Sequence, residues 1–367
     1  MLYSSKEGIL IAGNRHADFA SLHMFYDVGM KDDGEMPGLA HLCEHIIEMR
    51  SMNDGTFYFV ANAFLSMEYT CFYARGFTDD IPQIYKLQSQ LVASAIESVD
   101  ESLVESEKKR ILMENEAARK NFRRRSIMQL QEKIFGSGFT GQIDIIPETF
   151  SKIHLKDVKQ FIEAKYCLRP YMVYSGFIGD IMPCAIQEEN KSDTQKTRRK
   201  REQGIKSGLY QQNRFLCIAI ETIDGIREYF RLKVLLEIYR LIWNTYYDEK
   251  IISTAVKLFD IKTLLIVEFK TELGGCSERF FKMEEADFIL YFGVSVQKVK
   301  LDLLHRLHDL AAYNLFLYKA YRYLREVYVG YDGIAGIFAN ISAPEILHIH
   351  KKLWTKQDLL MNNGGCK

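Results

Sequence analysis

The stretch that decides the fold is PGLAHLCEH, residues 37–45, which contains His41 and His45. On a helix, two residues four positions apart project from the same face. Two imidazoles in that relation can bind one tetrahedral zinc ion, at about 2.0–2.1 Å from each nitrogen. Glu44 borders the same face, where its carboxylate can accept a proton from a metal-bound water rather than bind the metal. The stretch therefore has the H-x-x-E-H pattern of a metal-binding helix.

The H-x-x-E-H pattern is the inverted form of HExxH, and both occur in zinc peptidases. The spacing alone is only suggestive, because the chain has 9 His in 367 residues. The pattern arises by chance in roughly one or two chains per hundred of that composition. The alternative interpretation is a helix with two packed or solvent-facing histidines.

A catalytic zinc site usually has three protein ligands and one open position, so a third ligand is needed from another helix. The helix predicted over residues 101–135 offers Glu107 and Glu114. These residues are two helical turns apart and so point the same way. Glu114 follows three apolar residues, and we expect it to face inward. The alternative is a charged helix face with i,i+4 ion pairs.

Three blocks of the sequence resemble the pitrilysin/insulinase family of metallopeptidases, which includes the mitochondrial processing peptidase and small bacterial relatives. Residues 28–45 are similar to the family's V-G-s segment, acidic stretch and P-G-L-A-H-x-x-E-H. Residues 107–114 match the family's E-K-x-x-v-l-x-E. Residues 144–166 and 169–179 are similar to its later stretch, t-x-x-d-l-x-x-F-x-x-x-Y, p-x-n and v-x-G. Further matching positions are Gly55, Asn62, Ala63, Thr70 and Tyr73. The resemblance is specific over about residues 20–180 and only architectural over residues 210–367.

This resemblance implies a ligand set and a base. His41 and His45 would bind Zn²⁺ through imidazole nitrogens, and Glu114 would be the third ligand. Glu44 would be the general base, which deprotonates the zinc-bound water and later protonates the leaving amine. An H-H-E set also accepts Mn²⁺ or Co²⁺, so the residues alone leave the native metal open.

The resemblance also implies two supporting roles. Glu107 would be a carboxylate that steers one of the histidine ligands. Asn62 and Ala63 would lie on an edge strand that pairs with an extended peptide substrate, so that backbone hydrogen bonds hold the peptide.

The second half departs from the family pattern. Family enzymes often carry an Arg and a Tyr in the second domain that contact the substrate and the oxyanion. In the matching stretch, residues 232–269, Arg240 and Tyr247 have the spacing of seven, but both fall within the predicted helix. In the family, one subunit can carry the zinc motif while its partner carries the Arg/Tyr pair. We therefore expect a heterodimer with a homologous partner subunit that supplies this half of the site.

The domain organisation follows from one polar segment, residues 187–208, which has no aromatic residue and one aliphatic residue, Ile205. Such a segment cannot bury enough surface to offset its ordering entropy. We expect it to link a zinc-bearing domain, residues 1–186, to a related domain, residues 209–367. The predicted fold class is α+β: two homologous domains of α/β sandwich type, as in the mitochondrial processing peptidase, that enclose a chamber.

The two halves share a predicted order of strand, helix, strand, long helix and short helix, which suggests a duplicated unit. In the first half we expect strands at 19–29, 68–76 and 171–176, and helices at 38–50, 80–97, 101–135 and 155–165. In the second half we expect strands at 214–222, 262–270 and 288–294, and helices at 226–247, 297–327 and 344–353.

Composition excludes several classes of protein. The 48 Lys+Arg balance the 48 Asp+Glu, so the general attraction that nucleic-acid binding needs is absent. No uninterrupted apolar stretch reaches about 18 residues, and no membrane association is expected. The seven cysteines are scattered without a CxxC, and the first residues show no signal-peptide pattern. We expect a cytoplasmic protein.

The leading hypothesis is a zinc-dependent endopeptidase that cleaves short or unfolded peptides, as the catalytic subunit of a heterodimer in peptide maturation. The alternative is a non-catalytic, substrate-binding or scaffold subunit of such a peptidase. Hydrolysis of a non-peptide amide is a third possibility.

Overall fold

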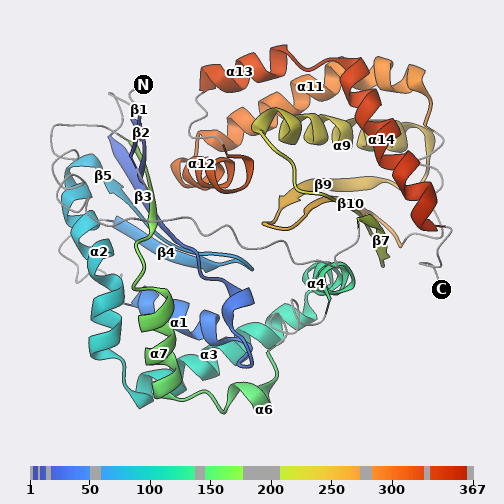
Figure 1. The fold of residues 1–367 in the computed structure, drawn as a ribbon. Helices are drawn as coiled ribbons and strands as arrows, with labels where there is room; N and C mark the ends of the chain where they lie inside the picture. The colour runs from blue at the N-terminus through green and yellow to red at the C-terminus, as the bar shows by residue number, and fades with distance from the viewer. Residues whose placement is uncertain are drawn as a thin grey trace. The chain divides into compact units, whose positions relative to one another are not determined.

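The computed structural model describes residues 3–6, 9–13, 18–49, 59–136, 145–176, 207–272, 283–325 and 331–361. The chain divides into two compact units (Figure 1). The N-terminal unit comprises Met1–Asn121, Ser137–Arg199 and Asp309–Tyr318, and the C-terminal unit comprises the rest. Both units combine a sheet with helices, which confirms the predicted α+β class.

The N-terminal unit is built on a six-stranded sheet of order β1-β2-β6-β3-β5-β4. Its strands are β1 (Tyr3–Lys6), β2 (Ile9–Gly13), β3 (Phe19–Tyr26), β4 (Phe59–Leu65), β5 (Thr70–Phe77) and β6 (Tyr171–Gly176). All neighbours are antiparallel except β2 and β6. Among the described strands β4, which contains Asn62 and Ala63, lies at one edge of this sheet.

The helices of this unit share one apolar core with the sheet. They are α1 (Leu39–Glu48), α2 (Ile81–Ser98), α3 (Glu101–Lys120), α6 (Pro147–Phe150) and α7 (Leu155–Lys165), with single 3₁₀ turns at Met30–Asp32 and Thr78–Asp80. The core joins Leu22 and Met24 of β3 to Leu42 and Ile46 of α1. Burial of this apolar surface fixes α1 and its motif on the sheet.

The long helix predicted over residues 101–135 is two helices. α3 ends at Lys120, the backbone of the next residue, Asn121, is extended (φ −78°, ψ 105°), and α4 (Phe122–Phe135) follows. Arg123 of α4 donates to Glu268 at 2.9 Å, within the C-terminal unit. The polar sequence around this break gave no signal strong enough to end the predicted helix.

The C-terminal unit is built on a four-stranded antiparallel sheet of order β7-β8-β10-β9. Its strands are β7 (Gly208–Gln212), β8 (Phe215–Ile220), β9 (Ile251–Leu258) and β10 (Thr263–Phe269). Its other helices are α9 (Ile226–Tyr246), α11 (Glu285–Leu307), α13 (Tyr331–Ala339) and α14 (Ala343–Met361), together with part of α12 (Leu310–Leu324).

Two predictions for this half are wrong. Residues 288–294 form part of helix α11 rather than a strand, and the helix predicted over 297–327 is divided between α11 and α12. A short apolar run is ambiguous by periodicity alone. The buried residues of α11 fall at helical spacing, with Phe288, Ser295, Leu303 and Leu307 on its inner face.

The first part of α12 belongs to the N-terminal unit. Asn314 donates to the carbonyl oxygens of Ser21 and Val173 at 3.0 and 3.3 Å. The ring of Tyr318 stacks on Phe25 with centroids 3.7 Å apart. This segment therefore covers the face of the sheet that lies opposite the core of α1, α2, α3 and α7.

The predicted polar linker, residues 187–208, lies outside the described residues except for its last two. The division into domains at that segment, and the duplication of one unit, therefore stay predictions. Among the helices of the described ranges, none combines the length and apolarity that crossing a membrane requires.

Candidate metal centre

The start of α1 is fixed by one buried carboxylate and one glycine. Asp33 accepts hydrogen bonds from the backbone N–H groups of Gly38 and Ala40, at 2.8 and 2.6 Å. Those N–H groups have no partner within the helix and need one elsewhere. Gly38 has a φ of 94°, and a Cβ there would approach Ile145 and Phe150 to 2.9 Å. Burial raises the pKa of Asp33 to about 7, although both hydrogen bonds oppose the rise.

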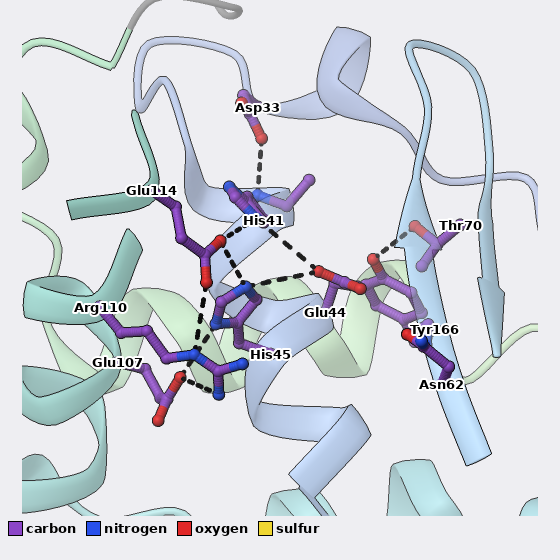
Figure 2. Close-up of polar contacts among 12 residues, drawn as sticks. Asp33, His41, Glu44, His45, Asn62, Thr70, Glu107, Arg110, Glu114 and Tyr166 are labelled. Carbon is purple, nitrogen blue, oxygen red and sulfur yellow. Dashed lines mark hydrogen bonds and ion pairs between the residues drawn. The ribbon is translucent and has the colours of Figure 1, made fainter. Parts of the chain in front are cut away.

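The two histidines and Glu114 converge, as Figure 2 shows. Glu114 Oε2 lies 3.7 Å from His41 Nε2 and 3.5 Å from His45 Nε2. The three potential ligand atoms lie within 4.8 Å of one another. Tetrahedral ligands with bonds of about 2.0–2.1 Å stand about 3.3 Å apart, so small side-chain movements suffice to hold zinc. The donor set expected from the sequence is therefore brought together by the fold.

Glu107 lies behind His45, on the side away from Glu114. Its Oε2 is 2.9 Å from His45 Nδ1, and both side chains are buried. A carboxylate at Nδ1 makes this nitrogen the protonated one and leaves Nε2 free to bind a metal. The structure thus places Glu107 where the resemblance implied a steering carboxylate.

Arg110 joins the two carboxylates of α3 and was given no role from the sequence. Its Nη1 lies 3.6 Å from Glu107 Oε2, and its Nε lies 3.3 Å from Glu114 Oε1. Arg110 is three residues after Glu107 and four before Glu114, the spacings at which helical side chains meet. This spacing was the sequence signal that could have identified Arg110. Asp33 was missed because its partners are backbone groups.

Glu44 faces the same point from α1. Its Oε2 lies 3.9 Å from Nε2 of both His41 and His45. Burial is the main cause that raises the pKa of Glu44 to about 8, and the charges of Glu48 and Glu114 add to it. A cation held by the histidines would favour the ionised carboxylate and oppose this rise. Glu44 is therefore beside the metal position without being one of the three converging donors.

The opposite side of Glu44 is closed by a buried tyrosine (Figure 2). Tyr166 has its hydroxyl 2.9 Å from Thr70 Oγ1, and Thr70 donates to the carbonyl of Val28 at 2.7 Å. The Tyr166 hydroxyl is therefore the donor to Thr70. Burial raises its pKa well above the usual value, and the charge of Glu44 acts in the same direction. The phenol stays neutral at all ordinary pH values.

The centre is buried on one side and open on the other. His45 and Glu44 are 6% and 7% exposed, whereas Glu114 is 44% exposed. Access to the metal position is therefore from the side of Glu114 and His41, which is 25% exposed.

The edge strand carries the two predicted substrate-binding residues. Asn62 pairs in register with Tyr73 of β5, and its Oδ1 accepts a hydrogen bond from the N–H of Ala63 at 2.7 Å. Within the described residues β4 has β5 as its one strand neighbour. An edge of this kind can pair with an added strand.

Of the candidate Arg/Tyr pair of the second half, both expected within the predicted helix, only Arg240 lies within a helix. Arg240 lies within α9 and donates to Glu237 at 2.9 Å. Tyr247 directly follows the helix, with its ring centroid 4.5 Å from that of Trp243. Arg240 is therefore held by its own helix.

Comparison with known proteins agrees with this fold. Residues 9–143 match the sequence profile of insulinase, peptidase family M16. No curated protein matches the chain. A chain of complex III2 from Candida albicans, bound to Inz-5, superposes with a TM-score of 0.71 at 14% identity, over 96% of this chain and 92% of that one.

Two further structures are similar. A putative M16-like peptidase from Alicyclobacillus acidocaldarius has a TM-score of 0.61 at 14% identity, over 92% of this chain and 90% of that one. The periplasmic protease PqqL from Escherichia coli has a TM-score of 0.67 at 13% identity, over 97% of this chain and 46% of that one. The fold is thus that of M16-like peptidases. The profile match over residues 9–143 agrees with the resemblance to the pitrilysin/insulinase family that the sequence shows.

Proposed function

We propose that the protein is a zinc-dependent endopeptidase that cleaves short or unfolded peptides. The observation that carries the proposal is the convergence of His41, His45 and Glu114 with Glu44 directly beside them. The match of residues 9–143 to the profile of insulinase, peptidase family M16, supports peptide-bond hydrolysis as the reaction.

The donor set fits zinc, because two imidazoles and one carboxylate leave the fourth position open. When bound, the metal would lower the pKa of a water and stabilise charge on the carbonyl oxygen of the substrate. Glu44 takes the proton of the attacking water and returns it to the leaving amine. Glu107 holds His45 in the ligating tautomer, and Asp33 holds the start of α1.

The substrate we propose is an extended peptide paired with β4. Its backbone would meet the edge at Asn62 and Ala63, and its scissile bond would enter from the exposed side of Glu114. Backbone pairing accepts many sequences, which suits varied or unfolded peptides.

We further propose that a homologous partner subunit supplies the missing Arg/Tyr half. The ion pair of Arg240 with Glu237 supports this, because it occupies the candidate arginine. The chain also spans 46% of the length of PqqL, so a second chain of similar size would match that protein.

The alternative is a non-catalytic, substrate-binding or scaffold subunit. The structural similarity to a chain of complex III2 favours this non-catalytic alternative, because the name of that assembly mentions no peptidase. The three potential metal ligands beside Glu44 argue against the non-catalytic alternative, because a scaffold subunit does not require a general base next to a metal site.

Replacement of the proposed base separates the two functions. Glu44→Gln should lower cleavage of a peptide library by about 10²–10⁴-fold while zinc content is retained. Glu116→Gln, on the exposed face of α3, is the matched control and should cleave as the parent does. Cleavage that Glu44→Gln leaves unchanged, or a parent chain inactive with its partner and zinc present, would favour the scaffold.

A further inference from the structure

Three exposed apolar side chains belong to neighbouring strands of the N-terminal sheet, at the side where β4 forms its edge. Val60 of β4, Phe77 of β5 and Phe19 of β3 are 58%, 47% and 57% exposed. The rings of Phe19 and Phe77 stack, with their centroids 4.9 Å apart. Single exposed apolar residues are ordinary, whereas a group of them marks a binding surface. We call these three residues the β4 apolar patch.

The strand register puts the three residues of the patch on one face of the sheet. Phe19 is paired with Phe77, and Val60 is paired with Arg75. Arg75 and Phe77 are two residues apart on β5 and so point to the same face. Val60 is therefore the diagonal neighbour of Phe77, a separation that an aromatic side chain can span.

The backbone of β4 offers hydrogen bonds at its free edge through two alanines. At the turn from β4 to β5, the N–H of Ser66 donates to the carbonyl of Tyr69 at 2.9 Å. Hydrogen-bonded and non-hydrogen-bonded pairs alternate along antiparallel strands, so Val60 belongs to a hydrogen-bonded pair with β5. The N–H and C=O groups of Ala61 and Ala63 therefore point to the side where no described strand lies.

An antiparallel peptide that adds to β4 would exchange hydrogen bonds with Ala61 and Ala63. The peptide residue opposite Val60 would then form a non-hydrogen-bonded pair, in which the Cα atoms stand about 4.5 Å apart and side chains are closest. Its side chain would share the face of the patch. The other face of β4 is the one that packs Ala61 and Ala63 against the core.

The charge beside the patch is already compensated. Arg75, the partner of Val60 on β5, has its Nη1 3.3 Å from Oδ2 of Asp309, which belongs to the same unit. A peptide side chain placed on Val60 therefore meets apolar surface and an ion pair without net charge. Such a surface favours an apolar side chain over a charged one, because a charged group would lose water without gaining a partner.

We propose that the β4 apolar patch is a subsite for an apolar side chain of the bound peptide, at the peptide residue opposite Val60. The next peptide residue on this face lies opposite Asn62, which is polar and exposed, so the preference is confined to one position. The inference rests on the proposed function, because it requires a peptide paired with β4. It adds the substrate class, which is extended peptides with an apolar residue at a fixed distance from the scissile bond.

The first test measures peptide binding without cleavage, in Glu44→Gln loaded with zinc. The probes are two fluorescein-labelled peptides of about ten Ser and Thr residues, identical except for one central Leu. Fluorescence anisotropy should show that the Leu peptide binds at least about fivefold more tightly, because its Leu side chain leaves water. Val60→Asp should abolish this difference, and the conservative Val60→Ile should retain it.

The matched control is Ile252→Asp, since Ile252 is an exposed aliphatic residue on β9, the edge strand among those described for the other sheet. This variant, also made in Glu44→Gln, should keep the preference for the Leu peptide. Thermal melting of each variant confirms that the chain is folded.

The second test locates the subsite relative to the scissile bond. The parent chain should cut the Leu peptide at a fixed distance from Leu, so that moving Leu by two residues moves the cut by two. Mass spectrometry of the products measures this distance. In Val60→Asp the position of the cut should no longer follow Leu.

The outcomes separate the subsite from the proposed function. Equal binding of the two peptides, or a Leu preference that survives Val60→Asp or is lost equally in Ile252→Asp, overturns the subsite and leaves the peptidase proposal standing. Failure of both peptides to bind a folded chain that holds zinc contradicts the pairing with β4, and the subsite with it.

Discussion

Each unit contains a buried histidine whose Nδ1 is hydrogen bonded, and the two differ in what surrounds them. In the N-terminal unit, His45 Nδ1 meets the Glu107 carboxylate while Nε2 faces Glu44 and Glu114. In the C-terminal unit, His350 Nδ1 lies 2.8 Å from the hydroxyl of Tyr239, which accepts from Trp354 at 2.9 Å. The Glu107 carboxylate can only accept at His45 Nδ1, whereas the Tyr239 hydroxyl at His350 Nδ1 has a proton of its own.

The difference shows that burial by itself does not make a site. His350 is enclosed by aromatic rings, and burial lowers its pKa to about 4, so it is a neutral core residue. His45 is equally buried, but three carboxylates converge on it, and its Nε2 faces two of them. Convergent anionic oxygens around a fixed tautomer are the feature that defines a metal centre.

The largest effect on zinc binding is expected from replacing the first of these two histidines, His45. His45→Ala should weaken zinc binding by more than about a hundredfold, because it removes a direct ligand. His350→Ala should leave zinc affinity unchanged and lower the stability of the C-terminal unit. Competition with a fluorescent zinc chelator measures both variants. Equal zinc loss in both would contradict the assignment.

A somewhat smaller effect is expected from the carboxylate behind His45. Glu107→Gln should weaken zinc binding by about 10- to 100-fold, since the amide no longer fixes the tautomer as strongly. The comparable variant Glu237→Gln removes the partner of Arg240 in α9 and should leave zinc binding as it is. The same competition assay distinguishes them, and an unaffected Glu107→Gln would show that His45 is oriented by packing alone.

The pH dependence of stability should depend on His350. Its pKa is lowered in the folded state, so the unfolded chain binds a proton first as pH falls below about 6.5. Stability is therefore lost from about pH 6.5 down to about pH 4, by about 2 kcal/mol between pH 7 and pH 5. Urea unfolding of the parent and of His350→Phe at both pH values measures this change in the free energy of unfolding. The same change in both proteins would contradict a neutral, buried His350.

The smallest effects compare two glycines. Gly38→Ala should destabilise the N-terminal unit by about 1–3 kcal/mol, because φ is positive and the new Cβ meets Ile145 and Phe150. Gly336→Ala, within α13 and with open space around it, should stabilise the chain by about 0.5–1 kcal/mol. Thermal unfolding gives both signs, and a stabilising Gly38→Ala would contradict the described start of α1.

The sequence contained most of the candidate site because helical spacing is a local property. His41, Glu44 and His45 share one helix, and Glu107 and Glu114 share another, so the five side chains needed only one packing event between α1 and α3. Asp33 was not predictable in the same way, because its partners are backbone N–H groups that any residue carries.

The errors in the fold arose where burial and periodicity disagree. Residues 288–294 read as a strand because nearly all of them are apolar, yet Leu290 and Val294 are exposed on α11. A sequence does not state which apolar residues of a helix stay exposed, and such residues are therefore easily misread as core. β1 and β2 were missed because short strands carry little pattern.

The most direct test of the central claim is the zinc content of the purified chain, determined by elemental analysis with and without the proposed partner subunit. The account predicts one zinc per chain in the parent and none in a His41→Ala, His45→Ala variant that still folds. A parent chain that holds no zinc in either preparation would contradict it.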